Sequence, residues 1–317
     1  MYSHPEPPPV SRPPPPRTHP PWYHFVLFMV TLLSMTAAGA MQRGVNPLAG
    51  PAALVHLIEG LPFAATLLTI LAVHEFGHYY AARRWHVSAT LPYFIPLPFV
   101  SFLGTLGAVI KIRSAIPHKR ALLDIGTAGP LAGFVLASGA CLVGLAQSQA
   151  VDPAYFDPHP PIRLGTPLLF AAFARLVAPV AGPDQIVLLS PVAFAGWVGL
   201  FITAFNLFPV GQLDGGHVVY ALFGHAHRYI ARTFYAILLF MGIYGILSMV
   251  WNLPPEWPQG WPGWLVLALL LTILGRDHPP PYFGHIPLNR SRRVIGYLSL
   301  LVFILCFTPV PFSYSIP

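Results

Sequence analysis

The stretch LPFAATLLTILAVHEFGHYYAARR, residues 61–84, decides the fold of this chain. Within a long apolar run it carries the H-E-x-x-H pattern as His74, Glu75 and His78. On a helix, positions i and i+4 share a face, so both imidazoles can bind one zinc ion while Glu75 reaches a water on that ion. The residues just before the motif, 58–73, include a single charged side chain. Each ionised group deep in such a helix costs about 2.5–3.5 kcal/mol, so the pattern predicts a functional site within a membrane.

Composition places the chain among polytopic membrane proteins. Of its 317 residues, 55% are hydrophobic and 9% are charged, whereas soluble domains carry about 25% charged residues. The net charge of +7 does not indicate a nucleic-acid partner, because the basic residues cluster beside the ends of apolar segments. Cys141 and Cys306 lie within apolar segments, which predicts free thiols and no disulfide framework. The expected surroundings are therefore a lipid bilayer.

Three regions divide the chain. Residues 1–22 contain ten prolines and predict a disordered cytoplasmic tail with no signal peptide. Residues 23–311 form the expected transmembrane domain, and residues 312–317 a short C-terminal tail. A helix crosses a bilayer with about 20 apolar residues. By that measure we predict an all-α polytopic fold of about six to seven transmembrane helices, with apolar segments at 23–40, 61–82, 121–147, 189–209, 229–251, 263–275 and 293–311.

The connection between the second and third segments has an unusual composition. Residues 91–113 are apolar but interrupted by prolines and glycines, and residues 107–113 have the composition of a strand. One interpretation is a re-entrant β-hairpin, which is tolerated at membrane depth when it is buried in protein or lines a cavity. Its open edge could accept an extended peptide by strand addition. The alternative is an ordinary interfacial loop, and the residues alone leave both open.

The basic residues predict the orientation of the chain. With the N-terminus in the cytoplasm, fourteen of the seventeen Lys and Arg residues lie inside, and only Arg43, Arg163 and Arg175 lie outside. Cytoplasmic loops of membrane proteins carry such an excess of positive charge. The H-E-x-x-H motif then lies towards the cytoplasmic end of its helix.

Past the third apolar segment, acidic residues within the membrane are scarce, and Asp214 stands there within the stretch NLFPVGQLDGGH at residues 206–217. One proline and three glycines break the helix there, which frees backbone groups that need partners inside the protein or from water. A catalytic zinc takes three protein ligands and keeps one position open. The two histidines supply two ligands, so Asp214 is a candidate for the third. It could instead cap the following helix, and the two roles are compatible.

Together, HEFGH on a membrane helix and the later N-x-x-P-x-x-x-x-L-D-G pattern resemble the site-2 protease family of intramembrane zinc metalloproteases, peptidase family M50, in its compact form without PDZ or CBS modules. The resemblance covers most of residues 61–310. It implies one zinc ion per chain, held by His74, His78 and Asp214, with Glu75 as the general base. Asn206 would hold the substrate backbone or stabilise the oxyanion.

Two further stretches resemble the family. Residues 93–112 are similar to its re-entrant hairpin, and residues 126–133 resemble its G-x-x-G-P motif. Gly133 stands where many members have asparagine, and His86 where the family often has glycine. The resemblance implies additional substrate-binding residues at Gly107, Gly129 and Pro130.

The implied reaction is hydrolysis of peptide bonds in membrane-spanning substrate helices, known as regulated intramembrane proteolysis, in a bacterial inner membrane. Zinc would polarise the scissile carbonyl and lower the pKa of its water to about 7. Glu75 would take the proton and pass it to the leaving amine. The site would lie towards the cytoplasmic side, and the substrates would be transmembrane proteins.

Other functions remain to be weighed. An inactive family member could act as a membrane-protein chaperone or scaffold. A metal transporter could also place His and Asp in the membrane, but transporters usually have repeated halves and none is visible. Another class of membrane zinc protease takes a downstream glutamate as its third ligand, and no glutamate falls within the membrane after Glu75.

Overall fold

A computed structural model describes residues 19–314, except residues 48, 157–161, 252, 255–256, 258, 276–283 and 285. Most of the predicted proline-rich tail therefore lies outside the described residues. The helical domain begins at Pro21, two residues earlier than predicted, because proline is favoured in the first turn of a helix.

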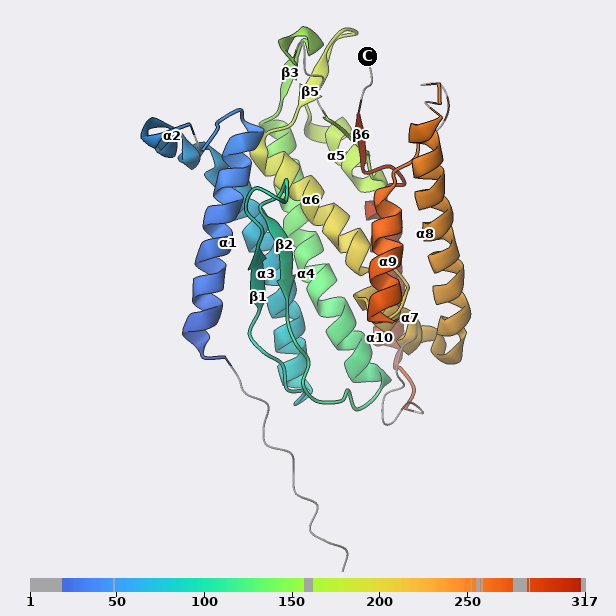
Figure 1. Cartoon of the computed structure of the whole chain (residues 1–317). Coiled ribbons are helices and arrows are strands. Elements are labelled where there is room, and N and C mark those ends of the chain that lie inside the picture. The colour runs from blue at the N-terminus through green and yellow to red at the C-terminus, as the bar shows by residue number, and fades with distance from the viewer. Residues whose placement is uncertain are drawn as a thin grey trace, which may run out of the picture.

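The described chain is mostly helical, as predicted (Figure 1). A helix lies at each predicted apolar segment. Among the described residues, four helical stretches are long and apolar enough to cross a membrane, namely Pro21–Gln42, Pro51–Arg84, Lys119–Ala146 and Asp214–Val250. The count of six to seven spans stays a prediction. The main helices are α1 (Pro21–Gln42), α3 (Leu61–Arg84), α4 (Lys119–Ala146), α6 (Pro191–Asn206), α7 (Asp214–Phe223), α8 (His227–Val250), α9 (Gly263–Leu274) and α10 (Arg290–Cys306).

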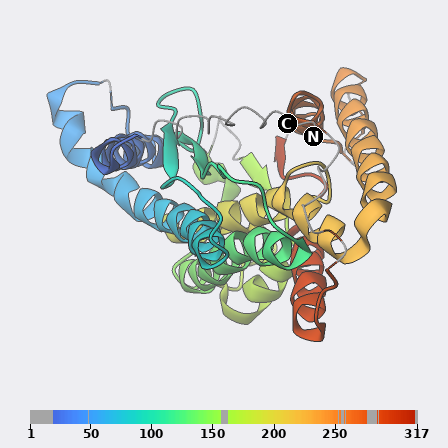
Figure 2. The ribbon, with the colours of Figure 1, turned by 90° about the horizontal axis from the view of Figure 1, so that it is seen from below.

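Helices α3, α4 and α6 form the centre of the molecule, with α4 packed against both of the others. Figure 2 shows α1 at one edge of the bundle and α8 at the opposite edge. Glycines allow the close approach. A Cβ on Gly199 of α6 would stand 2.8 Å from Ala137 of α4 and 3.1 Å from Ile70 of α3. Small residues at such crossings are typical of helices packed in membranes.

The connection between α3 and α4 contains a β-hairpin. Strands β1 (Tyr93–Pro96) and β2 (Thr105–Val109) pair antiparallel, and an isolated bridge joins Ala89 to Ile112. The predicted strand at 107–113 thus begins earlier and is broken at Ile110, whose backbone N–H is used elsewhere. The strands run alongside α1 and α3 (Figure 1). That the hairpin enters a membrane stays a prediction.

Side chains of α1 hold this hairpin at both ends. At its base, His24 Nδ1 donates to the carbonyl of Pro92 at 3.0 Å. Near its tip, Ser34 Oγ donates to the carbonyl of Gly104 at 2.5 Å, and Gln42 Nε2 to that of Phe102 at 3.0 Å. Helix α1 also packs along β1. Within the described chain, β2 pairs with β1 alone, so its other edge carries no strand.

Except for η3, the remaining elements lie at the opposite end of the bundle from the start of α4 (Figure 1). The short helices are α2 (Pro51–His56), η1 (Leu57–Gly60), η2 (Pro153–Phe156), α5 (Leu168–Val177) and η3 (Gly224–Ala226), of which η3 joins α7 to α8. Strand β3 (Gln149–Val151) pairs with β5 (Ile186–Leu188), and β4 (Ile162–Leu164) with β6 (Phe312–Tyr314). The predicted C-terminal tail thus begins as a strand, because β4 supplies a partner distant in sequence.

Candidate metal centre

Three side chains from two distant parts of the sequence converge at one point. His74 and His78 face the same way from α3, and their Nε2 atoms lie 3.1 Å apart. Oδ2 of Asp214 lies 3.5 Å from Nε2 of His74 and 3.2 Å from Nε2 of His78. The two histidines are buried and the Asp214 side chain is 17% exposed. The structure therefore brings together the three predicted ligands.

The spacing of these atoms fits a zinc ion. Zinc bonds to nitrogen and oxygen at about 2.0–2.2 Å in a tetrahedron, whose ligand atoms then lie about 3.3–3.5 Å apart. The three observed separations, from 3.1 to 3.5 Å, are close to the edges of such a tetrahedron. Two imidazole nitrogens and one carboxylate oxygen are also a donor set that zinc accepts, and three protein ligands leave one position open. Among the described residues, no other group of His, Cys, Asp or Glu side chains is arranged to hold a metal.

One face of α4 makes room for the histidines. A Cβ on Gly129 would stand 2.2 Å from Nε2 of His78, and one on Gly133 would stand 3.3 Å from Nδ1 of His74. Gly126, one turn before Gly129, faces His217 with a would-be Cβ 2.8 Å from Cβ of that histidine. The three glycines, spaced i, i+3 and i+7, share one face of the helix. The glycines within residues 126–133 therefore leave space for the side chains of the site.

A backbone carbonyl of α4 fixes the orientation of His78. Nδ1 of His78 lies 2.7 Å from the carbonyl oxygen of Ile125, which can only accept a hydrogen bond. Nδ1 must therefore carry the proton, which leaves the Nε2 lone pair free for a metal. Such outer partners set the tautomer and ring orientation of metal-binding histidines. Nothing in the sequence alone distinguished Ile125 from its apolar neighbours.

The chain places Asp214 through a tight bend between α6 and α7. Helix α6 ends at Asn206, and Asp214 is the first residue of α7. A Cβ on Gly215 would stand 1.9 Å from the carbonyl oxygen of Leu207, and one on Gly216 would stand 2.2 Å from that of Gly211. Only glycines allow this approach, so the Asp-Gly-Gly sequence is needed to bring the carboxylate back to α3. The N-cap residue of α7 is Leu213, and Asp214 follows it as the first helical residue.

Two further predicted residues lie at the same site. Glu75 is buried at 7% exposure, and its carboxylate accepts a hydrogen bond from the backbone N–H of Ile110, just beyond β2. Nδ2 of Asn206 lies 3.2 Å from Nε2 of His74. The predicted base and the predicted substrate-binding amide thus flank the ligand group. The contact from Ile110 joins the hairpin to the site and was not predicted.

The three remaining predicted contacts have different surroundings. Gly129 lies against His78, and Pro130 lies inside α4 just after it. Gly107 lies in β2 opposite Ile95, with a φ of +104°, and no heavy atom lies within 4 Å of a Cβ built on it. A role in substrate binding for these residues stays a prediction.

His86 lies beyond the end of α3, exposed and outside the ligand group. Its φ of +54° is in the left-handed region that favours glycine. The N–H of Val87 donates to the carbonyl of Ala82, and the N–H of His86 to that of Arg83, which together form a Schellman motif. This geometry accounts for the glycine expected at the position of His86.

Comparison with known proteins adds to this geometry. A family model described as Peptidase family M50 matches residues 62–250. "Probable zinc metalloprotease EGY1, chloroplastic" is 37% identical over 199 residues in Oryza sativa subsp. japonica, covering 62% of this chain and 34% of the relative. In Arabidopsis thaliana the protein of that name is 37% identical over 196 residues, covering 61% and 35%.

A longer match is found with "Probable zinc metalloprotease EGY2, chloroplastic" of Oryza sativa subsp. indica. It is 27% identical over 305 residues, covering 93% of this chain and 51% of the relative. The chain thus matches about a third of the length of the EGY1 relatives and about half of this one.

Proposed function

The chain belongs to peptidase family M50, and from that membership we propose that it is a zinc-dependent endopeptidase that cleaves membrane-spanning protein segments. The observation that carries the proposal is the group formed by His74, His78 and Asp214, whose donor atoms lie at separations close to the edges of a zinc tetrahedron with Glu75 beside them. The names of the relatives give the same metal and reaction class.

His74, His78 and Asp214 would hold the ion. A zinc ion bound there would act as a Lewis acid on the scissile carbonyl and lower the pKa of a water to about 7. Glu75 lies on α3 beside the ligand group but outside it, so it can accept the proton from the attacking water and return it to the leaving amine nitrogen. The Ile110 N–H holds one side of that carboxylate, which restricts its rotation.

Asn206 completes the arrangement. Its amide lies on the His74 side of the ligand group, where Nδ2 can donate to a substrate carbonyl oxygen as negative charge develops. Amide side chains are among the groups that form oxyanion holes. This placement supports the role expected for Asn206.

The free edge of β2 is the place at which a substrate would be bound in extended form. Among the described residues no strand pairs with it on that side, and Leu106 and Val109 are exposed at 68% and 50%. A helix hides its carbonyls in hydrogen bonds, so a substrate must unwind before hydrolysis. Strand addition would hold the unwound segment. Ile110, the residue after Val109, donates its backbone N–H to the Glu75 carboxylate. A strand added along β2 would therefore lie beside the base.

We further propose that the site lies towards the cytoplasm and that the substrates are transmembrane proteins. Arg83, Arg84, Lys119 and Arg120 flank the ends of α3 and α4 nearest to the ligand group, as positive residues do on the cytoplasmic side. A scaffold would not require the buried placement of Glu75, and a transporter would not require a base held clear of the metal.

The test compares wild type with Glu75→Gln in cells, with quantitative proteomics of membrane-protein fragments. The variant should keep zinc and accumulate at least one uncleaved transmembrane protein, because loss of a general base costs about 10²–10⁴-fold in rate. Chelation of zinc in wild-type membranes should give the same accumulation, reversed by added zinc. Cleavage that persists at the wild-type rate in Glu75→Gln would refute the role of Glu75 as the base. If neither Glu75→Gln nor zinc chelation changed any membrane-protein fragment, the proposed protease activity would be refuted.

A further inference from the structure

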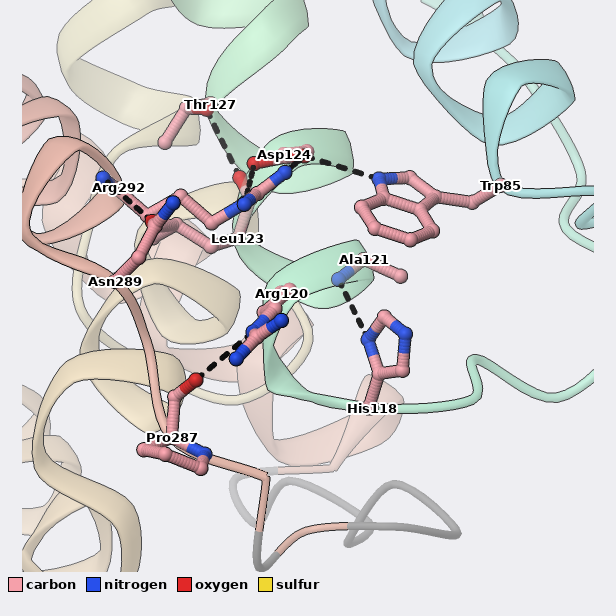
Figure 3. Close-up of polar contacts among 10 residues, drawn as sticks. All are labelled: Trp85, His118, Arg120, Ala121, Leu123, Asp124, Thr127, Pro287, Asn289 and Arg292. Carbon is pink, nitrogen blue, oxygen red and sulfur yellow. Dashed lines mark hydrogen bonds and ion pairs between the residues drawn. The ribbon is translucent and has the colours of Figure 1, made fainter.

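A polar cluster lies at the end of the bundle where α3 ends and α4 begins (Figure 3). Asp124 accepts hydrogen bonds from Nε and Nη2 of Arg292 at 2.9 and 2.8 Å, and from the indole N–H of Trp85 at 3.0 Å. The guanidinium carbon of Arg292 lies 5.4 Å from the centre of the Trp85 ring. The three side chains come from α4, α10 and the end of α3, and we call them the Asp124 cluster.

The hydrogen bonds of this cluster hold its side chains in one fixed geometry. Arg292 binds the carboxylate with two parallel hydrogen bonds, a geometry that lysine cannot reproduce. The side chains of Arg292 and Asp124 are 23% and 25% exposed, so the pair is only partly screened by water. The hydrogen bonds to Asp124 raise the pKa of Arg292. Between residues 61 and 146, Asp124 is the only acidic residue besides Glu75, and neither the reaction nor the metal uses it.

The cluster adjoins the carbonyl that orients a zinc ligand. Ile125 follows Asp124 directly, and its carbonyl accepts the Nδ1–H of His78. The side chain of Ile125 packs in a buried group with Ala82 and Val87, the residues of the Schellman motif that ends α3. Trp85 belongs to that same turn. The cluster therefore joins the end of α3 to α4 next to the contact between Ile125 and His78.

A second contact joins α4 to the segment before α10 but avoids the cluster. Nε of Arg120 donates to the carbonyl of Pro287 at 2.9 Å. The side chain of Arg120 forms no described hydrogen bond with the side chains of Asp124 or Trp85 (Figure 3). Substitution of Arg120 would therefore remove a contact between α4 and the segment before α10 and leave the hydrogen bonds of Asp124 in place.

We propose that Asp124, Arg292 and Trp85 are positioning residues that hold the Ile125 carbonyl against His78 and thereby strengthen zinc binding. The inference rests on the proposed metal centre. It assigns a role to Arg292, which lies outside residues 62–250 that match the family model. The carbonyl can orient the imidazole only while α4 keeps its position at the end of α3. The hydrogen bond from Trp85 to Asp124 is a polar contact between these two segments.

The experiment measures zinc affinity of the purified full-length protein by competition with a chelator, together with the unfolding temperature. Asp124→Asn, Arg292→Lys and Trp85→Phe should each weaken zinc binding by about tenfold, the lower range for outer-shell changes. Arg292→Lys keeps the charge, and Trp85→Phe keeps an aromatic ring. Because the residues act as one unit, Asp124→Asn combined with Arg292→Lys should be no worse than the stronger single change.

Two controls make the outcomes distinguishable. Arg120→Ala should lower the unfolding temperature and leave zinc affinity unchanged. If it weakens zinc binding as much as Asp124→Asn, the cluster is merely structural and the inference is overturned. Asp214→Ala should lose zinc. Suppose that Asp214→Ala loses zinc but the three cluster variants, Asp124→Asn, Arg292→Lys and Trp85→Phe, retain wild-type affinity. The proposed metal centre would then be supported, and the positioning role of the cluster would be refuted. If Asp214→Ala retains full affinity, the proposed centre itself is wrong.

Discussion

Gly129 lies so close to His78 that a Cβ built on it would stand 2.2 Å from Nε2 of the imidazole. The equivalent distance from Gly133 to His74 is 3.3 Å, to both Cβ and Nδ1. Two glycines on the same face of α4 therefore differ in how tightly they confine the two zinc ligands. The first leaves no space for a methyl group, whereas the second would accept one after a shift of a few tenths of an ångström.

Gly129→Ala should consequently disrupt the metal centre, because the new methyl group displaces the ligand atom of His78. Overpacking of this kind costs about 1–3 kcal/mol. We expect most of the bound zinc to be lost in metal analysis of the purified variant. Gly133→Ala is the matched control and should retain zinc. Equal zinc content in the two variants would contradict the confinement of His78 by α4.

The second prediction concerns the ligand set. His78→Ala and Asp214→Ala should each lose most of the zinc, which wild type should hold at about one ion per chain, because a site with two protein ligands binds weakly. Glu75→Gln should keep its zinc, since Glu75 lies outside the ligand group. Metal analysis after gel filtration in detergent measures this. Zinc retained by Asp214→Ala would remove Asp214 from the set.

The ligands could be predicted from the sequence because each follows from a local pattern. An i, i+4 histidine pair on an apolar helix and a carboxylate at a glycine-rich break are both visible in residue types alone. The contacts of Ile125 and Ile110 could not be predicted, because they use backbone atoms that every residue possesses. The pattern of Gly126, Gly129 and Gly133 resembles the family motif, but residue types alone do not tell which side chains these glycines face.

The number of membrane spans is difficult to predict from the sequence for a different reason. Helices α6 and α9 have 16 and 12 residues, shorter than the about 20 that cross a bilayer. Composition alone does not tell whether such helices cross, tilt or end inside the protein. Likewise Asp124 was not recognised as part of a cluster, because its partner Arg292 lies 168 residues away.

The third prediction concerns His86, whose φ of +54° strains any residue except glycine. His86→Gly should raise the free energy of unfolding by about 0.5–1 kcal/mol, since relief of about 1–2 kcal/mol of strain is partly offset by the flexibility of glycine. His86→Ala is the control that removes the imidazole and keeps the strain. Both should hold wild-type zinc. A loss of zinc in either would make His86 a ligand.

The fourth prediction concerns orientation. Reporter fusions after Arg84 and Arg120 should give a cytoplasmic signal, because positive residues are retained on that side. A fusion at Asp157, which lies outside the described residues, should give an external signal. The reverse pattern would place the metal centre towards the other face of the membrane.

The last prediction concerns the hydrogen bonds by which α1 positions the hairpin. Ser34 of α1 donates to the carbonyl of Gly104 near the hairpin tip. Just beyond the other end of β2, the backbone N–H of Ile110 donates to Glu75. Ser34→Ala should therefore lower the rate of proteolysis without loss of zinc, because a less fixed hairpin holds both the base and the substrate strand less well. Thr36→Val is the matched control, since the Thr36 hydroxyl donates to Leu32 within α1 itself. Assays on a purified transmembrane substrate in detergent would measure both variants. An equal rate loss in the two would show a general effect of α1, whereas a loss of zinc in Ser34→Ala would show that the hairpin supports the ligands rather than the base.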